Sequence, residues 1–222
     1  MKITKISNRS IMFTVPEDPT GIVNMNLILG EHNNFIIDTG TGESNVKAIL
    51  EYIGNDQKPV IAINTHAHWD HVFGNSALKG HIIVSHVLCR AAMDKNWDAD
   101  VKALLEGNAD YVDAELHKYL PNVVFEGNLH FPEDGISLFH TPGHSDDGIS
   151  IYDAVDKTLY VGDNFGVFDG VAKIWSDDKN AAKDFIEKYK QYDFVTCIPS
   201  HCNPQTKSVI SLLDVALAKQ WK

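Results

Sequence analysis

The sequence predicts an α/β protein in which helices cover a mixed or parallel β-sheet. Apolar, β-branched runs of strand length alternate along the chain with segments of helical periodicity, and turn-forming residues separate them. In addition, several of the predicted strands end directly at a histidine or an aspartate. Residues at strand ends lie on loops held by a rigid scaffold, where binding and catalytic groups are most often found.

We expect a single domain over residues 1–222, because a chain of this length can bury a sizeable core and nothing in it requires a second domain. Its composition, 44% hydrophobic and 22% charged, is typical of a globular protein. The net charge of −11 repels phosphate backbones, so nucleic acid is not an expected partner. The N-terminus lacks a signal-peptide pattern, and no apolar run approaches the roughly 18 residues of a membrane span, so we expect a cytoplasmic protein without membrane contact.

The first part of the chain predicts a strand meander and then strand–helix–strand alternation. The meander strands are expected over 11–15, 23–29 and 34–38. The breaks between them contain Pro16, Pro19, Gly21 and the turn 30–33. A helix over 44–53 follows, with apolar residues at helical spacing and Gly54 after its end. Next come a strand over 60–64, a short helical turn after Gly74 and a strand over 81–85.

The segment from 86 to about 120 is helical and polar, and we interpret it as a helical insertion of two or three helices. It is either a lid that carries substrate contacts or a cover for one face of the sheet. Strands are then expected over 122–125, 136–140, 149–152, 158–162 and 194–200. Two further helices are expected, at about 178–192 and 204–221.

The central motif of the chain is His-x-His-x-Asp-His, formed by His66, His68, Asp70 and His71 after the strand at 60–64. Residues two apart at the end of a strand point to the same side, so His66 and His68 can converge on one metal ion. Asp70 and His71 lie further along the turn and can reach a second position. Imidazole suits zinc or iron, and carboxylate completes a mixed nitrogen and oxygen site. Since one ion cannot take all four groups and a substrate, we predict two adjacent metals.

Three further strands end at a potential ligand: His144 after Thr141-Pro142-Gly143, Asp163 after the strand at 158–162, and His201. Asp38 ends the third meander strand and is either a turn-capping carboxylate or an acceptor that orients a metal-bound histidine. The three cysteines form no Cys-x-x-Cys pair, so reduced thiols are expected. Cys202 is either a buried structural thiol or a ligand.

Together, the His66–His71 motif, His144, Asp163 and His201, with Asp38-Thr39-Gly40, resemble the motif set of the metallo-β-lactamase superfamily over about residues 35–201. The resemblance implies an αβ/βα four-layer sandwich of two mixed β-sheets flanked by helices. It also implies that His66, His68 and His144 bind a first metal and that Asp70, His71 and His201 bind a second. Asp163 would bridge the two metals. His66, His68, Asp70, His71 and Asp163 are thereby also the predicted catalytic residues.

A pair of divalent ions activates water and polarises the scissile bond, so hydrolysis of a small-molecule substrate is the expected reaction. Zinc is the favoured metal, with iron or manganese as alternatives. Asp163 stands where β-lactamases of the family typically have Cys or Ser, and His68 where flavodiiron proteins have glutamate. The chain also resembles glyoxalase II in every metal ligand, but it does not match the basic C-terminal helical region with which that enzyme holds glutathione. These differences favour a thioester or lactone substrate. A phosphodiesterase, or a non-catalytic metal-binding regulator, is the alternative.

Five aromatic residues are candidates for lining the substrate pocket or for the core: Trp69, Phe73, Trp97, Phe165 and Phe168. Five other histidines have no ligand spacing and are expected to be structural: His81, His86, His117, His130 and His140.

Overall fold

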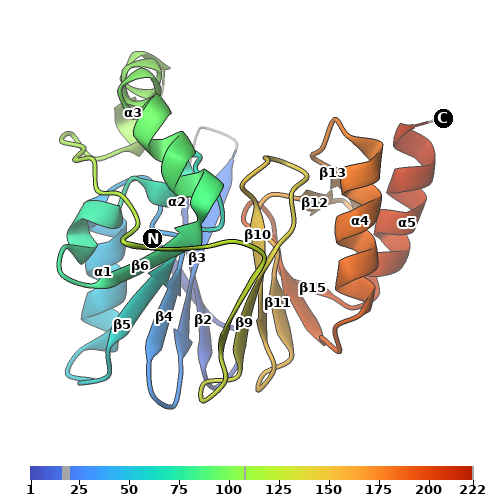
Figure 1. The fold of residues 1–222 in the computed structure, drawn as a ribbon, viewed down its shortest axis with the longest axis horizontal. Helices are drawn as coiled ribbons and strands as arrows, with labels where there is room; N and C mark the ends of the chain where they lie inside the picture. The colour runs from blue at the N-terminus through green and yellow to red at the C-terminus, as the bar shows by residue number, and fades with distance from the viewer. Residues whose placement is uncertain (17–20, 108, 222) are drawn as a thin grey trace. The chain divides into compact units, whose positions relative to one another are not determined.

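The computed structural model describes residues 1–16, 21–107 and 109–221 (Figure 1). Pro19, which contributes to one of the expected turns, lies outside these residues. Contacts within the chain divide it into two compact units, residues 1–125 and residues 126–222. Each unit contains one mixed β-sheet and helices, in agreement with the predicted α/β class.

The first unit is built on a seven-stranded sheet whose spatial order follows the chain. The pairs from β1 to β4 are antiparallel and those from β4 to β7 are parallel. The strands are β1 (Lys2–Lys5), β2 (Ser10–Pro16), β3 (Ile22–Leu29), β4 (Asn34–Ile37), β5 (Val60–Ile63), β6 (Ile82–His86) and β7 (Val123–Phe125). All residues of β4 and β5 are buried, which explains the continuous apolar runs over 35–37 and 60–63. Their carboxyl ends lie at one edge of the sheet because the two strands are parallel.

The helical elements of the first unit are α1 (Glu43–Ile53), α2 (Trp69–Val72), η1 (Asn75–Leu78), α3 (Val87–Gly107) and η2 (Ala109–Tyr111). Val46 and Ile49 of α1 pack into the core formed with the strands.

The expected helical insertion consists of the long helix α3 and the short 3₁₀ helix η2, and no further helix is present in the described residues before β7. These two helical elements match the lower of the two expected numbers, two or three. After η2 the chain is tied to α1 instead, because the carboxylate of Asp113 accepts hydrogen bonds from the amide (2.9 Å) and the hydroxyl (2.6 Å) of Ser44.

The second unit contains a six-stranded sheet in the order β15-β14-β11-β10-β9-β8 and a separate hairpin, β12-β13. Only the β11–β14 pair of the six-stranded sheet is parallel among the described strands. The strands are β8 (Asn128–Phe131), β9 (Ile136–His140), β10 (Ile149–Asp153), β11 (Thr158–Tyr160), β12 (Phe165–Phe168), β13 (Val171–Ile174), β14 (Thr196–Ile198) and β15 (Gln205–Thr206). Helices α4 (Lys179–Lys190) and α5 (Val209–Gln220) lie side by side in this unit (Figure 1).

Several strands have no counterpart in the sequence-based prediction: β1, β8, β12, β13 and β15. β1 and β8 lie at sheet edges and contain no fully buried residue, so they lack the apolar signal of a buried strand. The last helix begins at Val209 rather than near 204, because Gln205 and Thr206 pair with β14. In the described part of the chain, no helix is both long and apolar enough to cross a bilayer.

Candidate metal centre

Four predicted ligands lie together in the first unit, in the loop after β5 and in α2. The candidate ligand atoms of His66 and His68 lie within 4.8 Å of each other, and so do those of Asp70 and His71. His66 Nε2 is 3.0 Å from His68 Nδ1, and His71 Nε2 is 3.0 Å from Asp70 Oδ2. The rings of His66 and His71 are 4.1 Å apart between centroids, so the two pairs are neighbours. His68 is exposed whereas the other three are buried, which leaves the cluster open to solvent on the His68 side.

Asp38 orients His71. Its backbone is left-handed (φ 60°), and its Oδ2 lies 2.8 Å from His71 Nδ1. The amide of Thr65 donates to Oδ1 (2.7 Å) and the hydroxyl of Thr65 donates to Oδ2 (2.8 Å). Burial raises the pKa of the Asp38 carboxyl, although His71 and Thr65 oppose this shift. Since Nδ1 of His71 is engaged by the carboxylate, Nε2 is the nitrogen that remains for a metal. Of the two interpretations of Asp38, this geometry agrees with the carboxylate that orients a histidine rather than with the turn cap.

We expect Asp38→Asn to weaken metal binding by about 10- to 100-fold. Both Asp38 oxygens accept hydrogen bonds, so the amide nitrogen of asparagine would face a donor on either side. Competition with a chromophoric chelator measures the affinity. Asp153→Asn is the matched control. Asp153 is also fully buried, and its carboxylate accepts hydrogen bonds from the amides of Val155 and Asp156 in a turn. Equal metal affinity in the two variants would contradict the role given to Asp38.

Buried polar contacts also hold the backbone of α2. The amide of Thr39 donates to the carbonyl of His71 (2.8 Å). The side-chain oxygen of Asn75 accepts from the Thr39 hydroxyl (2.9 Å) and from the side-chain amide of Asn64 (3.0 Å). The loop after β4, the loop after β5 and the segment after α2 are therefore joined around the ligand cluster.

The other three predicted ligands come together in the second unit. Asp163 follows β11, His201 follows β14, and His144 lies in the turn between β9 and β10. His201 Nε2 is 2.9 Å and His144 Nε2 is 3.6 Å from the same oxygen, Oδ2 of Asp163. The parallel pairing of β11 with β14 brings Asp163 and His201 to the same edge of their sheet. One carboxylate thus contacts both imidazoles.

Asn164 and Gly143 position His144. Pro142 and Gly143 predict the tight turn that presents His144, whereas no local sequence pattern indicates the role of Asn164. The Asn164 side-chain oxygen accepts from the His144 amide (3.2 Å), and its nitrogen donates to the carbonyl of Thr141 (3.0 Å) and to the hydroxyl of Tyr189 (2.8 Å). A Cβ at Gly143 would lie 2.8 Å from the Asn164 oxygen and from the ring of Phe185, so the turn requires glycine. Burial raises the pKa of the Tyr189 phenol.

Trp175 also lies beside the candidate ligands of the second unit, although no sequence pattern predicts it there. Its ring is 5.7 Å from that of His201 and 6.4 Å from that of His144. Trp175 directly follows β13, one of the unpredicted strands, so its position depends on a hairpin that the sequence analysis did not find.

The candidate pocket-lining aromatics fall into different environments. Phe73, Trp97 and Phe165 are buried in hydrophobic clusters, Trp69 is partly buried, and Phe168 is exposed. No group of candidate metal ligands among the described residues includes Cys202 or the five histidines expected to be structural. All three cysteines are buried and none forms a disulfide, and burial raises the pKa of the Cys202 thiol.

Comparison with known proteins identifies the family. The model of the metallo-β-lactamase superfamily matches residues 18–201. The chain belongs to this superfamily. A solved metallo-β-lactamase from Pontibacter korlensis is 22% identical, with a TM-score of 0.73 over 99% of both chains. One from Hirschia baltica is 19% identical, with a TM-score of 0.71 over 97% of both. A curated human relative, acyl-coenzyme A thioesterase MBLAC2, is 23% identical over an alignment of 209 positions that covers 81% of this chain and 73% of that protein.

These similarities confirm two predictions, the metallo-β-lactamase superfamily and its fold class. The superfamily is one of metal-dependent hydrolases, and the His/Asp clusters of this member fit a metal site. The donor atoms are imidazole nitrogens and carboxylate oxygens, which suit a divalent transition metal.

Proposed function

We propose that the protein is a dinuclear metal hydrolase that cleaves a small acyl thioester with water, releasing a carboxylic acid and a thiol. In this proposal, His66, His68 and His144 hold one metal, Asp70, His71 and His201 hold the other, and Asp163 bridges them. The observation that carries the proposal is the contact of one Asp163 oxygen with both His144 and His201, since a bridging carboxylate must serve two ligand sets. Zinc is the proposed metal, because five of the seven ligands are imidazoles.

When bound, two divalent ions lower the pKa of a water molecule and polarise the scissile carbonyl. The task of the chain is then to hold the ligands in place. Asp38 and Thr65 fix the ring of His71, while Asn164 fixes the turn that carries His144. The exposed position of His68 favours entry of a substrate on its side of the cluster.

A thioester is preferred to a lactone because a curated relative carries the name acyl-coenzyme A thioesterase. The bridging position also differs from the Cys or Ser typical of β-lactamases, so β-lactams are not the proposed substrates despite the names of the solved relatives.

The test is an elemental analysis of untreated protein together with hydrolysis assays on thioesters, lactones, β-lactams and phosphodiesters. We expect about two metal ions per chain and turnover of thioesters that is lost on chelation and restored by zinc. If a phosphodiester were hydrolysed in preference to the thioesters, the proposed substrate class would be wrong and the protein would be a phosphodiesterase. Fully metallated protein that cleaves nothing in the panel would favour the metal-binding regulator and contradict the proposal.

A further inference from the structure

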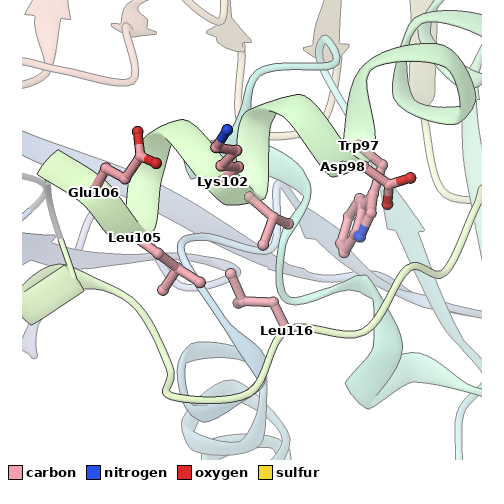
Figure 2. A pocket seen from close by; sticks show the side chains of 7 residues that line it. Trp97, Asp98, Lys102, Leu105, Glu106 and Leu116 are labelled. Atoms are coloured by element: carbon pink, nitrogen blue, oxygen red, sulfur yellow. The ribbon is translucent and has the colours of Figure 1, made fainter.

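We propose that a groove beside α3 holds the acyl chain of the substrate, an inference that rests on the proposed thioesterase function. The groove has a volume of about 600 Å³, within the range of small-molecule sites. It lies within the first unit, between one side of α3 and the segment that carries Leu116 (Figure 2).

The side chains that line the groove favour a hydrocarbon. Trp97, Val101, Leu105 and Leu116 provide its apolar surface. The side chains of Leu105 and Leu116 approach each other from the helix and from the facing segment (Figure 2). Leu105 is 45% exposed. A single exposed leucine needs no explanation, but apolar side chains gathered along one groove offer surface that a ligand can remove from water.

Packed side chains connect the wall of the groove with the ligand loop of the same unit. The ring of Trp97 packs on Phe73 at 4.8 Å between centroids, and Phe73 packs on Trp69 at 6.4 Å. In the sequence, Trp69 lies directly between the candidate ligands His68 and Asp70. Val101 and Leu116 belong to the hydrophobic cluster that also contains Trp69. Trp69, Val101 and Leu116 are partly buried members of this cluster, so an acyl chain whose thioester lies at His68 can contact them on its way along α3.

The charges around the groove disfavour an anionic occupant. Its polar lining consists of Asp98, Lys102 and Glu106, so two carboxylates flank one ammonium group. The chain as a whole has a net charge of −11. A fatty carboxylate or a phosphate placed here would meet a net negative surface, whereas an uncharged chain would not. The occupant is therefore the hydrocarbon part of the acyl group.

The test uses Leu105→Gln, with Leu88→Gln as its matched control. Both leucines lie on α3 and both are 45% exposed, but Leu88 is not among the residues that line the groove. The probe is S-decyl-N-acetylcysteamine, a neutral thioether that cannot be hydrolysed, titrated calorimetrically into the metal-loaded protein. We expect Leu105→Gln to weaken its binding about tenfold, because the substitution removes an apolar contact area. Leu88→Gln should bind it as the wild type does, and the S-ethyl analogue should not distinguish the three proteins.

A second readout follows turnover of neutral thioesters with acyl chains of increasing length. Leu105→Gln should raise KM for the decanoyl thioester and leave its kcat, and the KM for the acetyl thioester, unchanged. Equal affinity of Leu105→Gln and wild type for the decyl thioether would overturn the inference. The same holds if the substitution changes only the sedimentation of the protein, which would identify the groove as a contact between protein chains. If the decyl thioether binds in a Leu105-dependent manner but no thioester is cleaved, the proposed thioesterase function is wrong, whereas the groove is still a site for a hydrocarbon chain.

Discussion

We expect Asp163→Asn to lower the hydrolytic rate of the metal-loaded protein by at least about a hundredfold, and its metal affinity by at least about tenfold. The Asp163 oxygen contacts imidazole nitrogens of both His201 (2.9 Å) and His144 (3.6 Å). Asparagine keeps the shape of the side chain but removes the negative charge that would be shared between two cations. The loss therefore falls on metal binding and catalysis rather than on packing.

The control variant for Asp163→Asn is Asp147→Asn. Asp147 lies in the same unit and is 6% exposed, as Asp163 is, but it belongs to no group of candidate ligands among the described residues. Metal content by elemental analysis, thioester hydrolysis and thermal unfolding are measured for both variants. If Asp163→Asn retained the metal stoichiometry of the wild type, the bridging role would be wrong.

Gly74→Ala destabilises the protein by about 3 kcal/mol or more, the largest effect on stability that we expect from a single methyl group. A Cβ at Gly74 would lie 2.2 Å from the carbonyl oxygen of Thr39 and 2.7 Å from that of Gly42. These are backbone atoms, and Thr39 is itself bound to the carbonyl of His71. The loop after β4 would have to move away from α2, which also disturbs the contact of Asp38 with His71.

Denaturant unfolding measures this loss, and Gly107→Ala is the control. A Cβ at Gly107 meets nothing within 4 Å, and this glycine lies at the end of α3, where alanine favours the helix. Gly107→Ala should therefore unfold at the same or a slightly higher denaturant concentration than the wild type. An unchanged midpoint for Gly74→Ala would mean that the loop has more room than these distances allow.

The parts of the site that could be predicted are those with a local signal. The buried β-branched run of β5 and the spacing of His66, His68, Asp70 and His71 are visible within about ten residues. The core aromatics Phe73 and Phe165 have no such signal, because a ring next to a ligand motif can turn toward the site or toward the core.

The positioning residues could not be predicted because their partners are remote in sequence. Asn164 depends on Thr141 and Tyr189, and Trp175 depends on a hairpin whose strands are only four residues long. Likewise, the interaction of Asp113 with Ser44 links positions that no periodicity relates. Hydrogen bonds of this kind follow from the tertiary fold, whereas strands and helices follow from hydrophobic spacing.

The distribution of the buried thiols has a practical consequence. Cys89 lies in the first unit, whereas Cys197 and Cys202 lie in the second, and all three are shielded from solvent. Burial also raises the pKa of Cys197 well above its ordinary value, so little reactive thiolate forms while the surrounding structure is closed. An alkylating reagent can modify each cysteine only when its own unit opens. The rate of modification at each position is thus a natural reporter of local unfolding in that half of the chain.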